Sequence, residues 1–131
     1  MTTQTVTDTR AHLVGRAAEI GPVLTQHAAR HDHEGTWVAP AYAALADVGL
    51  LRMGVPTELG GAGATIADAA AVQRELGRHC GSTALASAMH QHVVAFTAWR
   101  YRRGLPGAEA TLRKVADDAM VLVSTGGGDF T

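Results

Sequence analysis

Glycine and proline residues divide this chain into short segments, and each segment has the composition of an α-helix. Alanine, the strongest helix former, supplies 25 of the 131 residues. Glycines stand between the segments, where they end helices or form turns. The chain is therefore predicted to be all-α, a helical bundle whose character changes only near its C-terminal end. The breaks fall at Gly35, Gly49, residues 60–63, Gly81 and residues 104–107.

Apolar residues recur at helical spacing inside these segments. Gly21-Pro22 interrupts the first, and because proline lacks an N–H group the helix should kink or restart there. Before the third, Thr65 is placed as an N-cap with Asp68 as its capping-box partner. The positions expected to face the interior are Leu13, Ala17, Ile20, Leu24 and Ala28 in the first helix, and Ile66, Ala69, Val72 and Leu76 in the third. The expected helices span residues 8–30, 38–48, 66–79, 83–103 and 108–118.

The C-terminal end has the composition of a buried strand. Residues 120–123 are all apolar, and three glycines follow at 126–128. A lone strand cannot satisfy its own backbone groups, so it should pair with chain outside this segment. We therefore expect three parts: a disordered lead-in at residues 1–7, a helical domain at 8–119, and the first strand and glycine turn of an incomplete β-domain at 120–131.

Charge and composition narrow the class of protein. Acidic and basic residues nearly balance, 12 against 11, for a formal net charge of −1, which excludes a broadly basic nucleic-acid binder. A hydrophobic fraction of 47% is sufficient for a core. Cys80 is the one cysteine, so no internal disulfide forms and a reducing compartment fits. No apolar run is long enough to span a membrane and the N-terminus is polar, so the expected location is the cytoplasm.

The loop Gly60-Gly61-Ala62-Gly63 precedes a helix, as phosphate-binding loops do. A dinucleotide-binding fingerprint needs another glycine at position 66, but residue 66 is Ile and no strand follows the helix. A P-loop needs a lysine, and none stands here. A turn between packed segments is therefore the favoured interpretation.

Histidines are the main candidates for a metal site. His27 and His31 lie four residues apart, a spacing that lets two ligands share one helix face, and His33 and Glu34 follow. No second pair of ligands stands at a zinc-like spacing. A solvated helix end is therefore the favoured interpretation, and no metal is expected.

The helix expected at residues 83–103 is the most apolar of the five. His90 and His92 lie two residues apart, about 200° around this helix, so they cannot both face one ligand, and one of them is expected to point inward beside Met89 and Val93. A core histidine is favoured there over a catalytic base. Cys80 is likewise favoured as a small buried residue at the helix end rather than as a nucleophile. The apolar face comprises Leu85, Met89, Val93 and Phe96.

Four stretches, taken in order, resemble one known family. Residues 20–35 (IGPVLTQHAARHDHEG) are similar to its first helix, and residues 39–63 (APAYAALADVGLLRMGVPTELGGAG) to its next helix and VP-x-E-x-GG-x-G loop. Residues 69–92 are similar to its paired central helices, and residues 121–131 to its entry into a β-domain. On these stretches the chain resembles the N-terminal part of the acyl-CoA dehydrogenases, flavoenzymes that oxidise acyl-CoA thioesters. VPTELGGAG is the most specific of them.

The resemblance implies a helical domain that packs against a β-domain and a C-terminal four-helix domain, with FAD between the latter two, in a homo-oligomeric enzyme. The implied reaction removes an α-proton from acyl-CoA with a glutamate and transfers a hydride to the flavin. That glutamate lies in a domain outside this chain, so no catalytic residue is assigned here. The helical domain would supply a wall of the acyl pocket. The residues implied for that wall are Leu85, Met89, His90, His92, Val93 and Phe96.

The last residues depart from the family pattern. The family's flavin-contacting segment has the form Thr-Glu-Pro-x-x-Gly-Ser-Asp, whereas residues 124–129 (STGGGD) are shorter and lack Glu-Pro. The departure leaves one alternative, a flavin-dependent monooxygenase of the same fold, and the unpaired strand with its glycine tail leaves another, a standalone helical interaction module. The chain alone is expected to be inactive. By resemblance, the flavin contacts would be Thr125, through a hydrogen bond to the ring, and Gly126, Gly127, Gly128 and Asp129.

Overall fold

The computed structural model describes residues 3–124 and, from residue 8 onward, their side chains. Within that range the chain forms α-helices and one short 3-10 helix, η1, which confirms the all-α prediction. None of the described helices combines the length and hydrophobicity that a membrane span requires. The bounds are α1 Thr3–Glu34, α2 Ala39–Asp47, η1 Thr57–Leu59, α3 Ile66–Gly77, α4 Gly81–Arg102 and α5 Ala108–Asp118.

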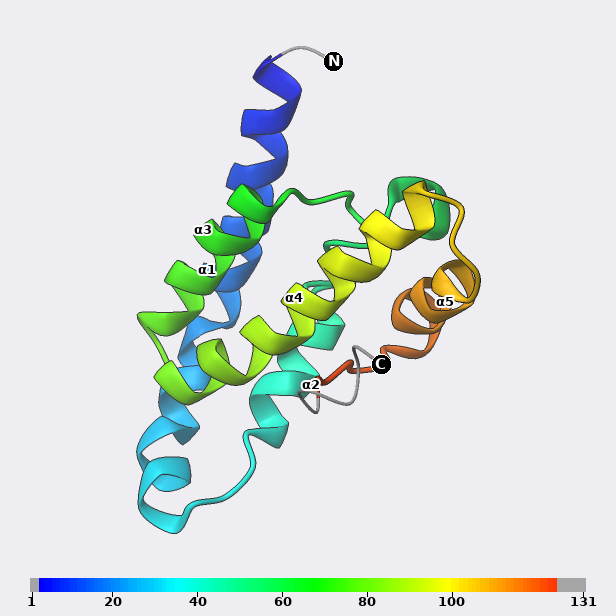
Figure 1. The fold of residues 1–131 in the computed structure, drawn as a ribbon. Coiled ribbons are helices and arrows are strands. Elements are labelled where there is room, and N and C mark those ends of the chain that lie inside the picture. The colour runs from blue at the N-terminus through cyan, green and yellow to red at the C-terminus, as the bar shows by residue number, and fades with distance from the viewer. Residues whose placement is uncertain (1–2, 125–131) are drawn as a thin grey trace.

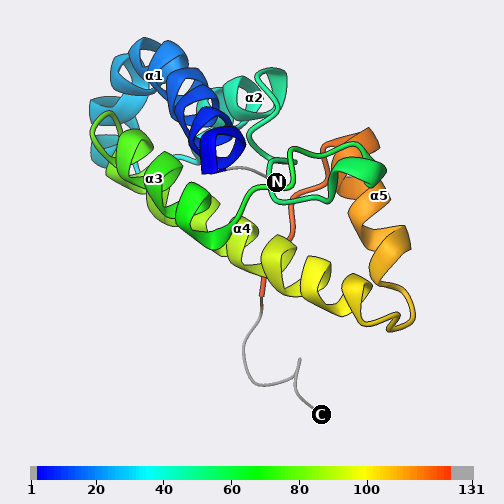
Figure 2. The ribbon, with the colours of Figure 1, turned by 90° about the horizontal axis from the view of Figure 1, so that it is seen from above.

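The helices pack as successive neighbours. α1 contacts α2 and α3, α3 contacts α4, and α4 contacts α5. Figure 1 shows α1 and α3 side by side, with α4 crossing the molecule from them to α5. Seen from above, α4 spans the molecule, with the α1–α3 pair near its first half and α5 near its end (Figure 2).

Two clusters of buried side chains fill the interior. The larger lies among α1, α2 and α3 and includes Leu13, Leu45 and Leu76. The smaller joins the second half of α4 to α5 and includes Val94 and Leu112. The segment between α2 and α3 contributes to both clusters and links them. Its residues Leu50, Leu51 and Met53 belong to the larger cluster, and Val55 and Leu59 to the smaller.

The predicted end of α2 at Gly49 is confirmed, and the hydrogen bonds show why a glycine stands there. The Leu50 N–H donates to Leu45 O at 2.9 Å, and the Gly49 N–H to Ala46 O at 3.0 Å. This pair of bonds is a Schellman motif, which needs a left-handed residue at the glycine position. Gly49 has φ +76°, a conformation that residues with a side chain rarely adopt.

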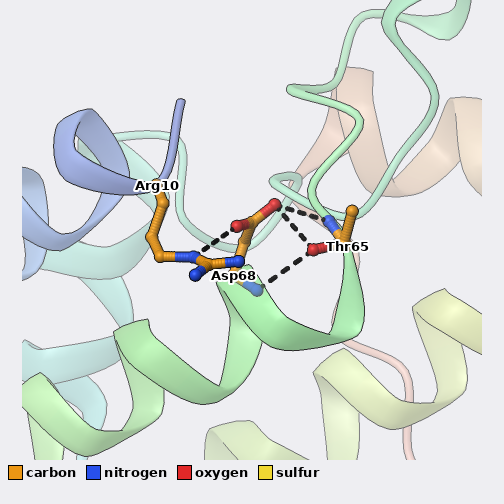
Figure 3. A network of polar contacts seen from close by, with 3 residues as sticks. All are labelled: Arg10, Thr65 and Asp68. Carbon is orange, nitrogen blue, oxygen red and sulfur yellow. Dashed lines mark hydrogen bonds and ion pairs between the residues drawn. The ribbon is translucent and has the colours of Figure 1, made fainter. Parts of the chain in front are cut away.

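The predicted capping box at the start of α3 is also confirmed, and Arg10 of α1 extends it (Figure 3). Asp68 Oδ2 accepts from the Thr65 N–H at 2.9 Å, and Thr65 Oγ1 accepts from the Asp68 N–H at 3.2 Å. Arg10 Nε donates to Asp68 Oδ1 at 2.8 Å. Burial alone would raise the pKa of Asp68, but the bonds from Thr65 and Arg10 outweigh it and lower the pKa. The network ties the start of α3 to α1.

α1 differs from the prediction in its start and in its continuity. It begins at Thr3 rather than near Asp8, and it runs through Pro22 without restarting. Packing explains why the helix continues, because the ring of His79, in the turn after α3, lies against the bare backbone of Gly21, where a Cβ atom would overlap it. Such tertiary contact outweighs one lost N–H group. The predicted face is confirmed for its buried members Leu13, Ala17, Ile20 and Leu24.

Ile66 was expected to be buried, and this expectation is wrong: its side chain is 67% exposed. The buried side of α3 follows Asp68, Val72 and Leu76, which are four residues apart. Ile66 precedes Asp68 by two residues and so lies about 200° around the helix from that side. The capping network, rather than hydrophobicity alone, sets the rotation of α3.

The strand predicted at residues 120–123 is not formed, and these residues have an irregular conformation. No partner strand is present among residues 3–124 to complete a ladder. The Leu122 N–H instead donates to His90 Nδ1 at 3.0 Å. Met120 and Leu122 pack against the smaller cluster, while Val121 and Val123 face solvent. The side chains therefore alternate between buried and exposed as in a strand, although the backbone forms no strand pairing.

Candidate functional site

The two sides of α4 have the opposite polarity from that of an ordinary surface helix. Large side chains point to solvent, while most of the buried ones are polar. Leu85 is 78% exposed and Phe96 51% exposed. We define the outer stripe as Leu85, Met89, His92, Phe96 and Trp99, which are spaced four or three residues apart and so share one helix face. The buried residues are Thr83, Ser87, His90, Gln91, Val94, Thr97 and Ala98.

The buried polar residues of α4 are held by specific hydrogen bonds. Thr83 Oγ1 donates to Cys80 Sγ at 3.2 Å, and Gln91 Nε2 donates to Leu50 O at 2.8 Å. Buried polar groups with such partners avoid most of the penalty of desolvation. These bonds fix the rotation of α4 about its axis and keep the outer stripe turned away from the interior.

His90 is fully buried and joins two segments of main chain. Its Nδ1 accepts from the Leu122 N–H at 3.0 Å, so its Nε2 carries the proton and donates to Leu51 O at 2.6 Å. Burial lowers the pKa of His90, and the bond to Leu51 opposes that shift only in part. A neutral ring is what both hydrogen bonds require. His90 therefore anchors the segment after α5 to the core of the described helices.

A groove of about 510 Å³ lies beside the second half of the outer stripe. The rings of Phe96 and Trp99 stack there with their centroids 5.9 Å apart. The Arg103 guanidinium lies 4.5 Å from the Trp99 ring centroid. An open groove with aromatic and aliphatic walls suits an apolar ligand or an apolar protein surface. The residues that line it include Ile66, Ala69, His92, Ala95, Phe96 and Trp99.

A family model for the N-terminal domain of acyl-CoA dehydrogenases matches residues 17–102. The match extends from the middle of α1 to the end of α4, and it includes the whole outer stripe. This chain belongs to the acyl-CoA dehydrogenase family. Comparisons with curated proteins and with solved structures gave no significant match.

The pocket residues that the acyl-CoA dehydrogenase resemblance implies divide into two groups. Leu85, Met89, His92 and Phe96 lie together on the outer stripe, with Val93 half-buried beside them. His90 lies apart from them, in the interior. The expectation that one of His90 and His92 points inward is confirmed, and that residue is His90. The five residues implied for the flavin, Thr125, Gly126, Gly127, Gly128 and Asp129, lie outside the described residues.

The other candidates from the sequence have structural explanations. The N–H groups of the glycine-rich loop form hydrogen bonds within its own turn. The Gly61 N–H donates to Pro56 O, and the Gly63 N–H donates to Val55 O. Cys80 is buried at the start of α4. Among residues 8–124 no three His, Cys, Asp or Glu side chains are grouped as metal ligands would be.

Two members of the candidate site were not assigned to it by sequence reasoning. Trp99 continues the outer stripe three residues after Phe96, and Ile66 reaches the same groove from α3. The periodicity of α4 contained the signal for Trp99, because the stripe extends at unchanged spacing. Nothing comparable indicated Ile66, since its exposure depends on how Asp68 orients the first turn of α3.

Proposed function

We propose that this chain forms the helical wall of the acyl pocket in an FAD-dependent acyl-CoA dehydrogenase. The observation that supports the proposal is the inverted polarity of α4, which exposes Leu85, Met89 and Phe96 while it buries hydrogen-bonded polar residues. A helix that leaves large apolar side chains in water has a surface suited to cover an apolar substrate or a neighbouring domain. An acyl chain has the matching chemistry, because it gains free energy when apolar surface covers it.

The same proposal gives a role to the segment that follows α5. Thr125 to Asp129 would contact FAD, which when bound supplies the acceptor for the hydride. His90 holds Leu122 by a hydrogen bond, three residues before Thr125, and Met120 packs against the smaller cluster. This chain would thus orient the start of the flavin-contacting segment relative to the outer stripe. The complete enzyme would be a homo-oligomer, as in the family.

The test uses the product of the complete reading frame that contains this chain. Acyl-CoA oxidation is followed with an electron-accepting dye for acyl chains of different length. Leu85→Ala and Phe96→Ala should change the KM for acyl-CoA and the preferred chain length, because each removes apolar surface from the wall. Val23→Ala, which truncates an exposed apolar residue on α1, is the matched control. Unchanged KM and chain-length preference in both α4 variants would rule out the acyl-wall role.

A flavin-dependent monooxygenase of the same fold is the second candidate. It is favoured by the sequence at 124–129, which lacks the family's Glu-Pro, and by His92, a polar ring within an otherwise apolar stripe. The full-length product would then consume oxygen when given reduced flavin and an apolar substrate, and it would not reduce a dye with acyl-CoA. His92→Ala should lower that oxygen-dependent turnover, while Val23→Ala should leave it unchanged.

A further inference from the structure

A second cleft, of about 570 Å³, lies apart from the outer stripe. It is formed by the first half of α1, the turn after α2 and the glycine-rich loop, whose chain segments meet near the centre of Figure 2. Glycines stand at several of its lining positions, and the absence of their side chains leaves the cleft wide. Its polar and glycine lining includes Asp8, His12, Arg16, Gly49, Arg52 and Gly60.

Two guanidinium groups converge on one point in this cleft. A Cβ atom placed on Gly49 would lie 3.4 Å from Arg16 Nη1 and 3.5 Å from Arg52 Nε. The two cations therefore flank the bare backbone of Gly49 from α1 and from the turn after α2. Like charges this close repel each other unless an anion lies between or beside them.

Neither of these arginines has a carboxylate partner among the described residues. Arg16 Nη1 donates to Val48 O at 3.0 Å, and Arg52 Nη1 to Ala116 O at 3.4 Å. Arg10 differs, because it forms an ion pair with Asp68. Each cleft arginine uses one of its N–H donors on a main-chain carbonyl near a helix end and keeps the others for a further partner.

The helix ends do not balance these charges. Each carries a partial negative charge of about half an electron, whereas each guanidinium carries a full positive charge. Asp8 also lines the cleft, and its side chain makes no ion pair or hydrogen bond within the described part of the chain. With Asp8 ionised, the cleft keeps a net positive charge.

We propose that this cleft binds a phosphate-bearing small molecule through Arg16 and Arg52. A phosphate monoester carries a charge of about −1.5 to −2 at neutral pH and has three acceptor oxygens. Such a ligand can accept hydrogen bonds from both guanidinium groups at once, and it matches their charge better than a ligand with a single carboxylate does. The loop N–H groups of Gly60, Gly61 and Gly63 already donate to carbonyl oxygens. Recognition in this cleft therefore rests on side chains and differs from that of a phosphate-binding loop. The inference does not depend on the acyl-wall proposal.

The test is a titration of the 131-residue chain with inorganic phosphate, pyrophosphate and acetate at matched ionic strength, followed by amide and arginine Nε–Hε chemical shifts. Saturable shifts are expected at Gly49 and at the Arg16 and Arg52 side chains. Phosphate and pyrophosphate should bind at least tenfold more tightly than acetate, because a second charge-assisted contact contributes about a factor of ten. Binding of acetate as tight as that of phosphate would overturn the proposed ligand class.

The variants separate binding from folding. Arg16→Gln and Arg52→Gln should each weaken phosphate binding about tenfold, and Arg30→Gln, an exposed arginine farther along α1, should leave it unchanged. Should a cleft variant fail to fold, Asp8→Asn still tests the site. Removal of this exposed negative charge should tighten phosphate binding about threefold in the same titration. Shifts that sodium chloride reproduces, or equal loss in Arg30→Gln, would show general ionic screening and refute the site.

Discussion

His90 connects the chemistry of one residue to the pH dependence of the whole fold. Its folded pKa is lowered by burial, so the neutral form is favoured in the folded state. Above the ordinary pKa of about 6.5, folded and unfolded chains are both neutral here and the full stability is present. As the pH falls below that value the unfolded chain takes up the proton more readily, and stability is lost down to the folded pKa.

We therefore expect urea to unfold the chain at a lower concentration at pH 5.5 than at pH 7.5. The variant His90→Gln isolates this contribution, because glutamine has a donor and an acceptor but does not titrate in this range. Its unfolding midpoint should depend less steeply on pH than that of the parent chain. Identical pH dependence in the two proteins would show that His90 does not titrate on unfolding.

The sequence indicates only some of the hydrogen bonds that hold the helices together. The capping box of Thr65 and Asp68 follows from the spacing of two residue types and was predicted. The bond from Arg10 to Asp68 joins positions 58 residues apart, and no local pattern indicates it. The same is true of the bond between His90 and Leu122, which requires knowledge of where the chain returns.

At the scale of the element, α4 shows that periodicity locates a face but does not tell what covers it. Spacing correctly grouped Leu85, Met89 and Phe96 on one face, but that face points to solvent, while hydrogen-bonded polar residues face the interior. The reason is physical: Gln91 and His90 each bond a main-chain carbonyl of the segment after α2, so they must point inward. Hydrophobicity alone would have predicted that the apolar side of α4 faces the interior and its polar side faces solvent.

This arrangement predicts which side of α4 stabilises the described fold. Leu85→Gln and Phe96→Gln should change the free energy of unfolding by less than about 0.5 kcal/mol, as exposed substitutions usually do. Val94→Ala should lower it by about 2 kcal/mol, because Val94 is fully buried and loses the equivalent of two methylene groups. Chemical denaturation measures the free energy of unfolding of all three variants and of the parent chain. A larger loss in the glutamine variants than in Val94→Ala would mean that the stripe packs inside.

At the end of α5, one substitution is expected to stabilise the fold rather than destabilise it. Ala119 is the one non-glycine residue with a positive φ, +51°, among the described residues. An L-residue in this conformation is strained by about 1–2 kcal/mol, and glycine relieves the strain while making the unfolded chain more flexible. Ala119→Gly should therefore raise the free energy of unfolding by about 0.5 kcal/mol.

The matched control for this prediction lies in the first turn of the same helix. Ala110 is exposed there with ordinary helical geometry, so Ala110→Gly should lower the free energy of unfolding by about 0.5 kcal/mol. Thermal melts of the two variants should move in opposite directions. Destabilisation by both substitutions would show that the left-handed conformation of Ala119 is not strained.

At the scale of the whole molecule, the segment between α2 and α3 unites the two clusters. Leu50 and Met53 belong to one and Val55 and Leu59 to the other. This segment contains VPTELGGAG, the stretch that most clearly indicated the family, so the recognisable motif is also the structural junction. Gly61 explains part of its pattern, because a Cβ atom there would overlap the carbonyl of Val55.

The positions of the acidic side chains decide whether α4 has a carboxylate that could act as a base. Among the described residues, the carboxylates nearest to α4 in sequence are engaged on other helices: Glu75 pairs with Arg78, and Glu109 with Arg113. None of the outer-stripe residues is acidic. A thioester lying along this stripe would therefore meet apolar side chains and His92, but no carboxylate base for its α-proton.

The purified 131-residue chain, supplied with FAD, acyl-CoA and an electron-accepting dye, should reduce the dye no faster than buffer. The product of the complete reading frame, assayed identically, is the positive control, and its stripe variants report on the same surface. Dye reduction by the short chain that requires acyl-CoA would place a base within these residues. The assignment of α4 as a passive wall would then have to be abandoned in favour of a catalytic role for one of its side chains, with His92 the first to substitute.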